Sequence, residues 1–235
     1  MLKSYNTLTK KKEKFIPIFD KNVKLFVCGP TVQDYTHIGH AKTYTQFDVI
    51  VKYLRYKKYN VFYLMNITDI DDKIINRAKE LRKIPSEIAN EYEKSFYEDM
   101  KLLKINSVNK YARATDHINE IVSQVLRLIK LSYAYKIKDG YYFDLSKFPN
   151  YGKLSGRTTL EAEDSISRID ENKDKRNKGD FCLLKFSKEG EPYWAVETEI
   201  DVSEEEYKKI IQNAIGDNDE EFLKLNKIDK TKWKM

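Results

Sequence analysis

The residues most suited to chemistry lie in one short stretch, at positions 27–40, which reads Val-Cys-Gly-Pro-Thr-Val-Gln-Asp-Tyr-Thr-His-Ile-Gly-His. It places a cysteine, a Gly-Pro break and two histidines close together. If a helix begins within this stretch, the free backbone N–H groups of its first turn and the positive end of its dipole are suited to binding a phosphate. We therefore expect residues 28–40 to form a binding site rather than a linker.

Two strands and a helix are expected to position this stretch. Residues 23–27 form a short apolar run, which predicts a buried strand, and the Gly-Pro pair ends that strand. From Gly39 to Lys57 the apolar residues recur at helical spacing, and residues 60–65 form a second apolar run. Strand, helix and strand in this order predict a βαβ unit with parallel strands and a right-handed crossover.

A second turn follows the second expected strand, at residues 66–72, where the sequence reads Asn-Ile-Thr-Asp-Ile-Asp-Asp. Cys28 and Thr68 thus lie just past the carboxyl ends of two neighbouring strands. Because ligands of open α/β sheets bind outside these ends, we expect the turns at 28–40 and 66–72 to face one another across a single pocket.

The aspartates of the second turn, Asp69, Asp71 and Asp72, have two interpretations. Carboxylates so close in sequence could bind magnesium. They could also cap and begin a helix, because Ile74, Ile75, Ala78 and Leu81 follow at helical spacing. Aspartate is common in turns and helix caps, so the sequence favours the second interpretation.

The rest of the chain predicts further helices, a hairpin and polar segments. Residues 1–22 are expected to be extended, with a short edge strand. Pro85 is expected to end one helix before another begins at Ser86. The remaining expectations are a helix at 86–104 with Tyr92, Phe96, Met100 and Leu103 buried; a helix at 115–132 with Ile118, Ile121, Val125 and Leu128 as its apolar stripe; a hairpin at 134–143; an exposed loop over most of 158–180; a strand at 180–186; and a helix at 203–215.

Composition places the chain among globular proteins of the reduced cell interior, and we expect a cytoplasmic location. Its 235 residues are 41% hydrophobic and 34% charged, with no apolar run long enough to span a membrane and no secretory signal at the N-terminus. The two cysteines are far apart in sequence. A net charge of +6 permits contact with a polyanion without requiring one.

An ordered set of motifs then identifies a family resemblance over about residues 1–194. The motifs are Tyr-Asn-Thr at 5–7, Cys-Gly-Pro-Thr-Val at 28–32, His-Ile-Gly-His at 37–40, Asn-Ile-Thr-Asp-Ile-Asp-Asp-Lys-Ile at 66–74, Ala-Thr-Asp-His-Ile at 114–118, Tyr-Gly-Lys-Leu-Ser-Gly-Arg at 151–157, Asp-Phe-Cys-Leu-Leu-Lys at 180–185 and Glu-Gly-Glu-Pro-Tyr-Trp at 189–194. In these motifs the chain resembles the cysteinyl-tRNA synthetases, which are class I aminoacyl-tRNA synthetases. The resemblance implies an α/β fold: the N-terminal part of a Rossmann-like catalytic domain with a parallel sheet and an inserted helix and hairpin region.

The resemblance also implies an activity and a set of site residues. Members of the family join L-cysteine to ATP, used with Mg²⁺, as cysteinyl adenylate, and then transfer cysteine to tRNA(Cys). By resemblance, His37 and His40 would be catalytic and would bind ATP together with Gly39, by stabilising charge that develops on the phosphates. Gly29 and Thr68 would line the cysteine pocket. Cys28 would be one ligand of a zinc ion that binds the thiolate of the substrate cysteine, and the preference of zinc for sulfur would reject serine as a substrate.

Each of these residues also has a plainer interpretation. Cys28 could be a small buried hydrophobe at a strand end. His37 could cap a helix, and His40 could be an ordinary surface residue. Among residues to which the resemblance gives no role, we interpret His117 as structural and Cys182 as part of the core.

The resemblance implies three regions: half of the catalytic domain at 1–110, a connective insertion near the tRNA acceptor end at 111–180, and the start of the second half with an unassigned tail at 181–235. The family's later zinc-ligand and lysine motifs are absent after Trp194, and beyond Cys28 the chain holds one cysteine and three histidines. We therefore expect a truncated member that self-associates or needs a complementing polypeptide. The alternatives are a non-catalytic nucleotide- or tRNA-binding module and a ligase that joins cysteine to a small amine.

Overall fold

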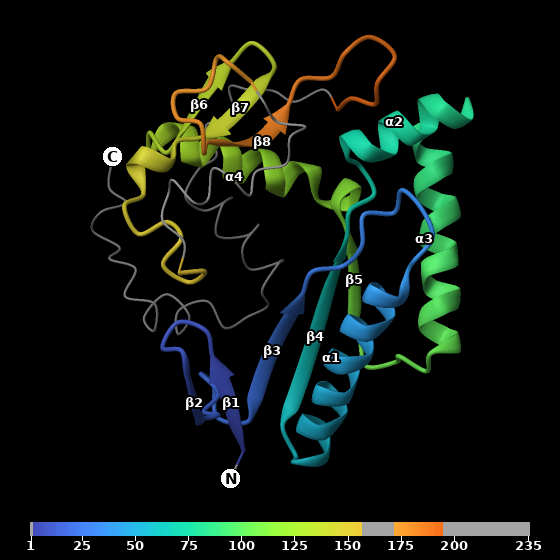
Figure 1. Cartoon of the computed structure of the whole chain (residues 1–235), viewed down its shortest axis with the longest axis vertical. Helices are drawn as coiled ribbons and strands as arrows, with labels where there is room; N and C mark the ends of the chain where they lie inside the picture. Colours follow the sequence, from blue (N-terminus) through green and yellow to red (C-terminus); the bar gives the residue numbers. More distant parts are fainter. Residues whose placement is uncertain (1, 157–171, 195–235) are drawn as a thin grey trace.

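The computed structural model describes residues 2–156 and 172–194, which form an α/β structure (Figure 1). The expected helix at 203–215 and most of the expected polar loop lie outside these residues. In chain order the elements are β1 (Lys3–Asn6), β2 (Lys11–Lys14), β3 (Asn22–Val27), α1 (Ile38–Tyr56), β4 (Asn60–Ile67), α2 (Asp72–Leu81), α3 (Pro85–Leu102), β5 (Lys110–Arg113), the 3₁₀ turn η1 (Ala114–His117), α4 (Ile118–Lys130), β6 (Ala134–Ile137), β7 (Gly140–Phe143), η2 (Leu145–Lys147) and β8 (Phe181–Lys185).

The central sheet contains β3, β4 and β5 in that order, and all three strands are parallel. β3 pairs with β4 along its whole length, from Asn22 opposite Asn60 to Val27 opposite Met65. This confirms the expected strand–helix–strand unit, with α1 as its crossover. β5 has no counterpart among the expected strands, because its sequence, Lys-Tyr-Ala-Arg, shows no apolar alternation; pairing with β4 holds it in place.

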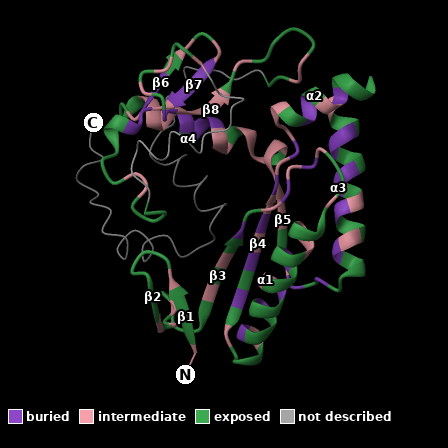
Figure 2. Cartoon of the chain, viewed as in Figure 1, coloured by how far each residue is buried: buried purple, intermediate pink, exposed green. Residues whose placement is uncertain are grey.

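Within the described residues, helices cover one face of this sheet (Figure 2), whereas the other face carries exposed apolar side chains. Alternate residues of β4 are buried and share one apolar cluster with residues of α1, α2 and α3, so these helices cover that face. On the opposite face, Phe26 and Phe62 remain 60% and 46% exposed. Parallel sheets are normally covered on both faces, so an exposed apolar face is unusual for a sheet of this type.

Several helix boundaries differ from the sequence expectations. α2 ends at Leu81 because Arg82 adopts a left-handed conformation, with φ of 53°. Pro85 does not end that helix but begins α3, at a position where its missing N–H costs nothing. Leu103, which was expected to be buried, lies at the end of α3 and is 46% exposed.

Two further segments also differ from expectation. The N-terminal residues form an antiparallel hairpin of β1 and β2 rather than a single edge strand, with Lys3 opposite Lys14. α4 begins at Ile118 after a 3₁₀ turn, and its buried residues are Val122, Ser123 and Val125. Of the expected apolar stripe only Val125 is fully buried, because the helix packs on β6 and β8 with a face rotated from that stripe.

A second, antiparallel sheet of β6, β7 and β8 packs on α4. The expected hairpin is confirmed, with Ala134 opposite Phe143, and so is the strand that follows residue 180. Cys182 lies on β8 but is only partly buried. None of the helices within the described residues is both long and apolar enough to cross a membrane.

Asp180 corrects the expectation of an exposed loop before β8, because its side chain is fully buried. Its carboxylate accepts hydrogen bonds from the Tyr135 hydroxyl at 2.6 Å, the Leu145 amide at 2.9 Å and the Asn177 amide at 3.0 Å. These donors come from β6, from the turn after β7 and from the segment before β8. A buried charge satisfied in this way ties three segments together.

We predict that Asp180→Ala lowers the free energy of unfolding by roughly 3 kcal/mol, because it leaves several buried donors without an acceptor. Asp174→Ala is the matched control: Asp174 is half-exposed and lies 3.9 Å from Lys138, so its loss should cost less than about 0.5 kcal/mol. Urea unfolding followed by circular dichroism measures both. Equal stability of the two variants would show that the Asp180 network does not hold this sheet.

Candidate functional site

The two turns after β3 and β4 are joined directly by backbone hydrogen bonds. The Val32 amide donates to the carbonyl oxygen of Thr68 at 3.1 Å, and the Thr68 amide donates to the carbonyl oxygen of Pro30 at 3.0 Å. Thr31 and Thr68 form a parallel bridge, which continues the pairing of the two strands beyond their ends. The two turns therefore lie side by side, as expected, but these bonds join them directly and, within the described residues, the single pocket expected between them is not found at this junction.

Gly29 is fixed at this junction by its lack of a side chain. Its amide donates to the side-chain oxygen of Asn66 at 2.9 Å, and the Asn66 side-chain amide reaches the Thr68 hydroxyl at 3.3 Å. A Cβ atom at position 29 would lie 1.7 Å from the carbonyl oxygen of Asn66. Gly29 and Thr68 are therefore brought together through Asn66, a residue to which the sequence analysis gave no role.

Cys28 is exposed, so the interpretation of this residue as a small buried hydrophobe is wrong. Its thiol has one weak contact, 3.7 Å from the carbonyl oxygen of Gly29. Within the described residues no group of three or more histidine, cysteine or acidic side chains is placed to hold a metal ion. Zinc requires three or four protein ligands, so these residues, which offer Cys28 alone, do not fit a zinc site.

His37 caps α1, as the plainer interpretation proposed. Its Nδ1 accepts a hydrogen bond from the Gly39 amide at 3.0 Å, and its own amide donates to Nδ1 of His40 at 3.3 Å. The amides of His40 and Ala41 donate to the carbonyl oxygen of His37. The expectation of free N–H groups in the first turn is thus wrong for these four amides, which already have acceptors.

The same hydrogen bonds determine what the two imidazoles can offer. Because Nδ1 of each neutral ring accepts a hydrogen bond, the proton of each ring is assigned to Nε2. The rings stack on each other with centroids 4.0 Å apart. Burial, followed by the charge of His37, lowers the pKa of His40, which favours its neutral form. With this assignment, Nε2–H of each ring can donate to a phosphate oxygen.

Neighbouring residues hold the histidines in place. The Thr36 hydroxyl donates to Asp99 of α3, which anchors the backbone just before His37. His40 stacks over Tyr44, with ring centroids 6.1 Å apart. Burial, with a smaller contribution from nearby Cys28, raises the pKa of Tyr44 to about 12.

The three aspartates of the second turn have separate structural partners. Asp71 caps α2 by accepting from the Lys73 amide at 2.8 Å, which confirms the helix-cap interpretation. Asp69 is buried and accepts from Arg113 Nε and from the Thr115 amide, each at 3.0 Å. Asp72 is paired with Lys185 of β8. Since no described cluster could hold a metal, the magnesium interpretation is not supported in this part of the chain.

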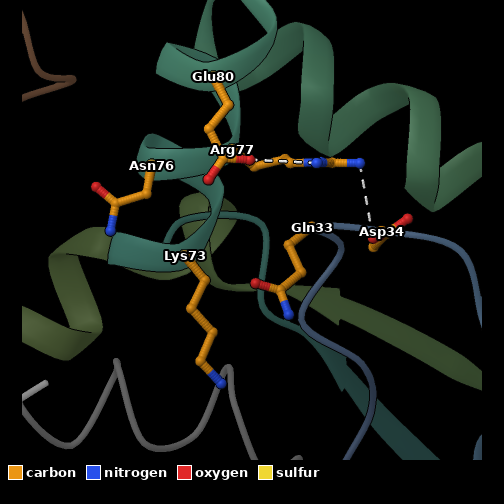
Figure 3. A pocket seen from close by; sticks show the side chains of 6 residues that line it. All are labelled: Gln33, Asp34, Lys73, Asn76, Arg77 and Glu80. Carbon is orange, nitrogen blue, oxygen red and sulfur yellow. Dashed lines mark hydrogen bonds and ion pairs between the residues drawn. The ribbon is translucent and has the colours of Figure 1, made fainter. Parts of the chain in front are cut away.

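A pocket of about 280 Å³ lies beside the junction of the turns, between the segment after Thr31 and the outer face of α2 (Figure 3). It is lined by Gln33, Asp34, Lys73, Asn76, Arg77 and Glu80. Sequence analysis missed it because charged residues at this helical spacing are typical of a solvated face. The only sequence signal for it was the position of these residues directly after the two turns.

Comparisons with known proteins find sequence relatives over most of the chain. A model of the tRNA synthetase class I (C) catalytic domain matches residues 14–198. A cysteine–tRNA ligase of Thermoplasma volcanium is 54% identical over 190 residues, which are 81% of this chain and 42% of the relative. That of Pyrococcus furiosus is 50% identical over 194 residues, or 83% of this chain and 40% of the relative.

Solved structures are more distant. Methionyl-tRNA synthetase of Mycobacterium tuberculosis in complex with methionyl-adenylate is 20% identical, with a TM-score of 0.46, and the match covers 53% of this chain and 25% of that one. A leucyl-tRNA synthetase of Agrobacterium radiobacter, in a ternary complex, is 19% identical with a TM-score of 0.45, over 55% of this chain and 17% of that one.

Alanine at the two glycines of the site should have very unequal effects on stability. Gly29→Ala forces a side chain into backbone and should cost at least about 3 kcal/mol in unfolding free energy. At Gly39 a Cβ atom would lie 2.8 Å from the His37 ring, which can move. Gly39→Ala should thus lose the cap and gain helix propensity, for a net change within about 1 kcal/mol. Thermal unfolding measures both variants, and similar costs would contradict the described junction.

Proposed function

Because the chain belongs to the family of class I tRNA synthetase (C) catalytic domains, we propose that it acts in the ligation of cysteine to tRNA. The chain spans about two fifths of the length of the cysteine–tRNA ligases that it matches. The proposed substrates are ATP with Mg²⁺, L-cysteine and tRNA(Cys), and the proposed location is the cytoplasm. Residues 1–110 would supply half of the catalytic domain, residues 111–180 an insertion near the tRNA acceptor end, and residues 181–235 the start of the other half.

The observation that carries this proposal is the pair of imidazoles at the start of α1, each of which accepts a hydrogen bond at Nδ1 and can donate through Nε2–H. In the first step a carboxylate oxygen of cysteine bonds to the α-phosphorus of ATP, the bond from that phosphorus to the bridging oxygen breaks, and pyrophosphate leaves. Phosphoryl transfer needs positioning and stabilisation of phosphate charge more than covalent help. His37 and His40 would donate from Nε2–H to the phosphate oxygens, and Gly39 leaves room for the His37 ring.

The cysteine substrate would bind at the junction of the two turns. The Thr68 hydroxyl is half-buried and is oriented by Asn66, and Gly29 allows the backbone to approach closely. Cys28 would then lie at the edge of this pocket. Because the described donors do not fit zinc, we assign no step to that metal; Cys28 would serve as a ligand only if a complementing polypeptide supplied the others.

The open face of the central sheet supports such a partner. Phe26 and Phe62 are exposed on one face, and β3 forms an edge of the sheet within the described residues. Covering this face would remove apolar surface from water, and a parallel strand could pair with the edge of β3. We propose that a complementing polypeptide or a second copy of the chain binds here. The isolated chain is predicted to be marginally soluble or to associate.

One observation favours a second candidate function. The described residues lack a metal-binding group, so the chain could bind nucleotide or tRNA without forming an adenylate. Such a module would keep the donors of His37 and His40 but would not support exchange of pyrophosphate into ATP.

Cysteine-dependent exchange of labelled pyrophosphate into ATP tests the proposal. The chain is assayed alone and mixed with the part of the Thermoplasma volcanium ligase that follows the matched region, and zinc is measured in the same samples. We expect exchange in the mixture, reduced about 10²-fold or more by His40→Ala, because a donor to the developing phosphate charge is lost.

His117→Ala is the control, because His117 lies at the start of α4 and pairs with Glu120 rather than entering the site. It should leave the exchange rate unchanged. ATP binding without any exchange in the mixture would favour the non-catalytic module. Exchange at the full rate in the His40→Ala sample would contradict the assigned role of the imidazoles.

A further inference from the structure

We propose that the pocket between residues 33–34 and α2 binds one backbone phosphate of an RNA strand, with Lys73 as its ionic partner and the side-chain amide of Gln33 as a hydrogen-bond donor. The choice of RNA rests on the proposed function, whereas the phosphate chemistry rests on the pocket itself. This site is separate from the imidazoles of His37 and His40.

Of the charged residues that line the pocket, Arg77 is paired with two carboxylates, whereas Lys73 is not paired with either. Arg77 lies 3.2 Å from Glu80 and 3.7 Å from Asp34, so both carboxylates share one guanidinium. Glu80, followed by Tyr92, raises the pKa of Arg77 further, which keeps it charged. Figure 3 shows Arg77 directed toward Asp34, whereas Lys73 extends from α2 away from these three charges. The accessible positive charge of the pocket is therefore that of Lys73.

The groups that remain available are mainly donors. Within the described residues, the side chains of Lys73, Gln33 and Asn76 have no hydrogen-bond or ion-pair partner. An ammonium and the NH₂ groups of two side-chain amides suit a ligand with several acceptor oxygens. A phosphate supplies them, and an ammonium readily binds it as a point charge.

The position and openness of the pocket favour a strand over a small molecule. Gln33 follows Val32, whose amide binds the carbonyl of Thr68, so the pocket borders the proposed cysteine site. The side chains of Asp34 and Glu80 are 55% and 65% exposed. Such a lining cannot enclose a small ligand on most sides, as small-molecule sites do. A single phosphate of a passing strand needs less enclosure, and contacts of this kind position nucleic acids.

The test measures binding of a tRNA(Cys) transcript by the full chain over a range of salt concentrations. Lys73→Gln should weaken binding several-fold at physiological salt and reduce the slope of log K against log[salt] by about 0.7, the value for one phosphate contact in a single strand. The fold should be kept, because Lys73 contributes only its backbone amide to the Asp71 cap. Lys73→Arg should restore the slope.

Lys94→Gln is the matched control, since Lys94 is an exposed lysine of α3 that does not line the pocket. It should change the slope less than Lys73→Gln does. Acylation of lysines, read by mass spectrometry, gives a second readout: bound RNA should protect Lys73 and leave Lys94 reactive. Equal protection of Lys73 by ATP or inorganic phosphate alone would overturn the assignment to RNA.

RNA binding with an unchanged slope and an unprotected Lys73 would overturn the whole inference, as would failure of the chain to bind RNA. Pyrophosphate exchange involves no RNA, so the two proposals fail separately. If pyrophosphate exchange occurs but RNA does not protect Lys73 from acylation, only the inference about the pocket is overturned. If RNA protects Lys73 but no pyrophosphate exchange occurs, the ligase proposal is overturned and the phosphate site is retained.

Discussion

The structure depends on the parallel pairing of β3 with β4 and on its continuation past the ends of both strands. The hydrogen bonds between Val32, Thr68 and Pro30 carry that pairing into the two turns, so the site is an extension of the sheet rather than a pair of independent loops. Gly29 is required because the two backbones approach within the reach of a Cβ atom. The helix that follows begins at Ile38, with His37 as its N-terminal cap.

Buried aspartates secure the elements around the junction. Asp48 of α1 accepts from the amides of Ser107 and Asn106, which fixes the segment that leads into β5. Burial alone would raise its pKa, but hydrogen bonds from Lys52 and Ser107 hold it below the usual value. Asp69 connects the second turn to Arg113, and Asp180 organises the smaller sheet. Each carboxylate satisfies backbone amides that no strand or helix could pair.

Apolar runs, helical spacing and turn residues predicted the elements that depend mainly on neighbouring residues in the sequence. The apolar runs before residues 28 and 66 and the helical spacing after Gly39 identified β3, α1 and β4, and Asp-Gly identified the hairpin of β6 and β7. β5 and the burial of Asp180 arise from pairing with distant residues, so a single sequence carries little signal for them. The motifs located the candidate site, but the tautomers of His37 and His40 follow from hydrogen bonds that only coordinates reveal.

We propose that the turns at 28–40 and 66–72 form one site for an activated amino acid. Amide hydrogen exchange of the chain, with and without a non-hydrolysable analogue of cysteinyl adenylate, tests this most directly. We expect slower exchange in both turns together and no change in the hairpin of β1 and β2. Protection confined to one turn, or located elsewhere in the chain, would contradict it.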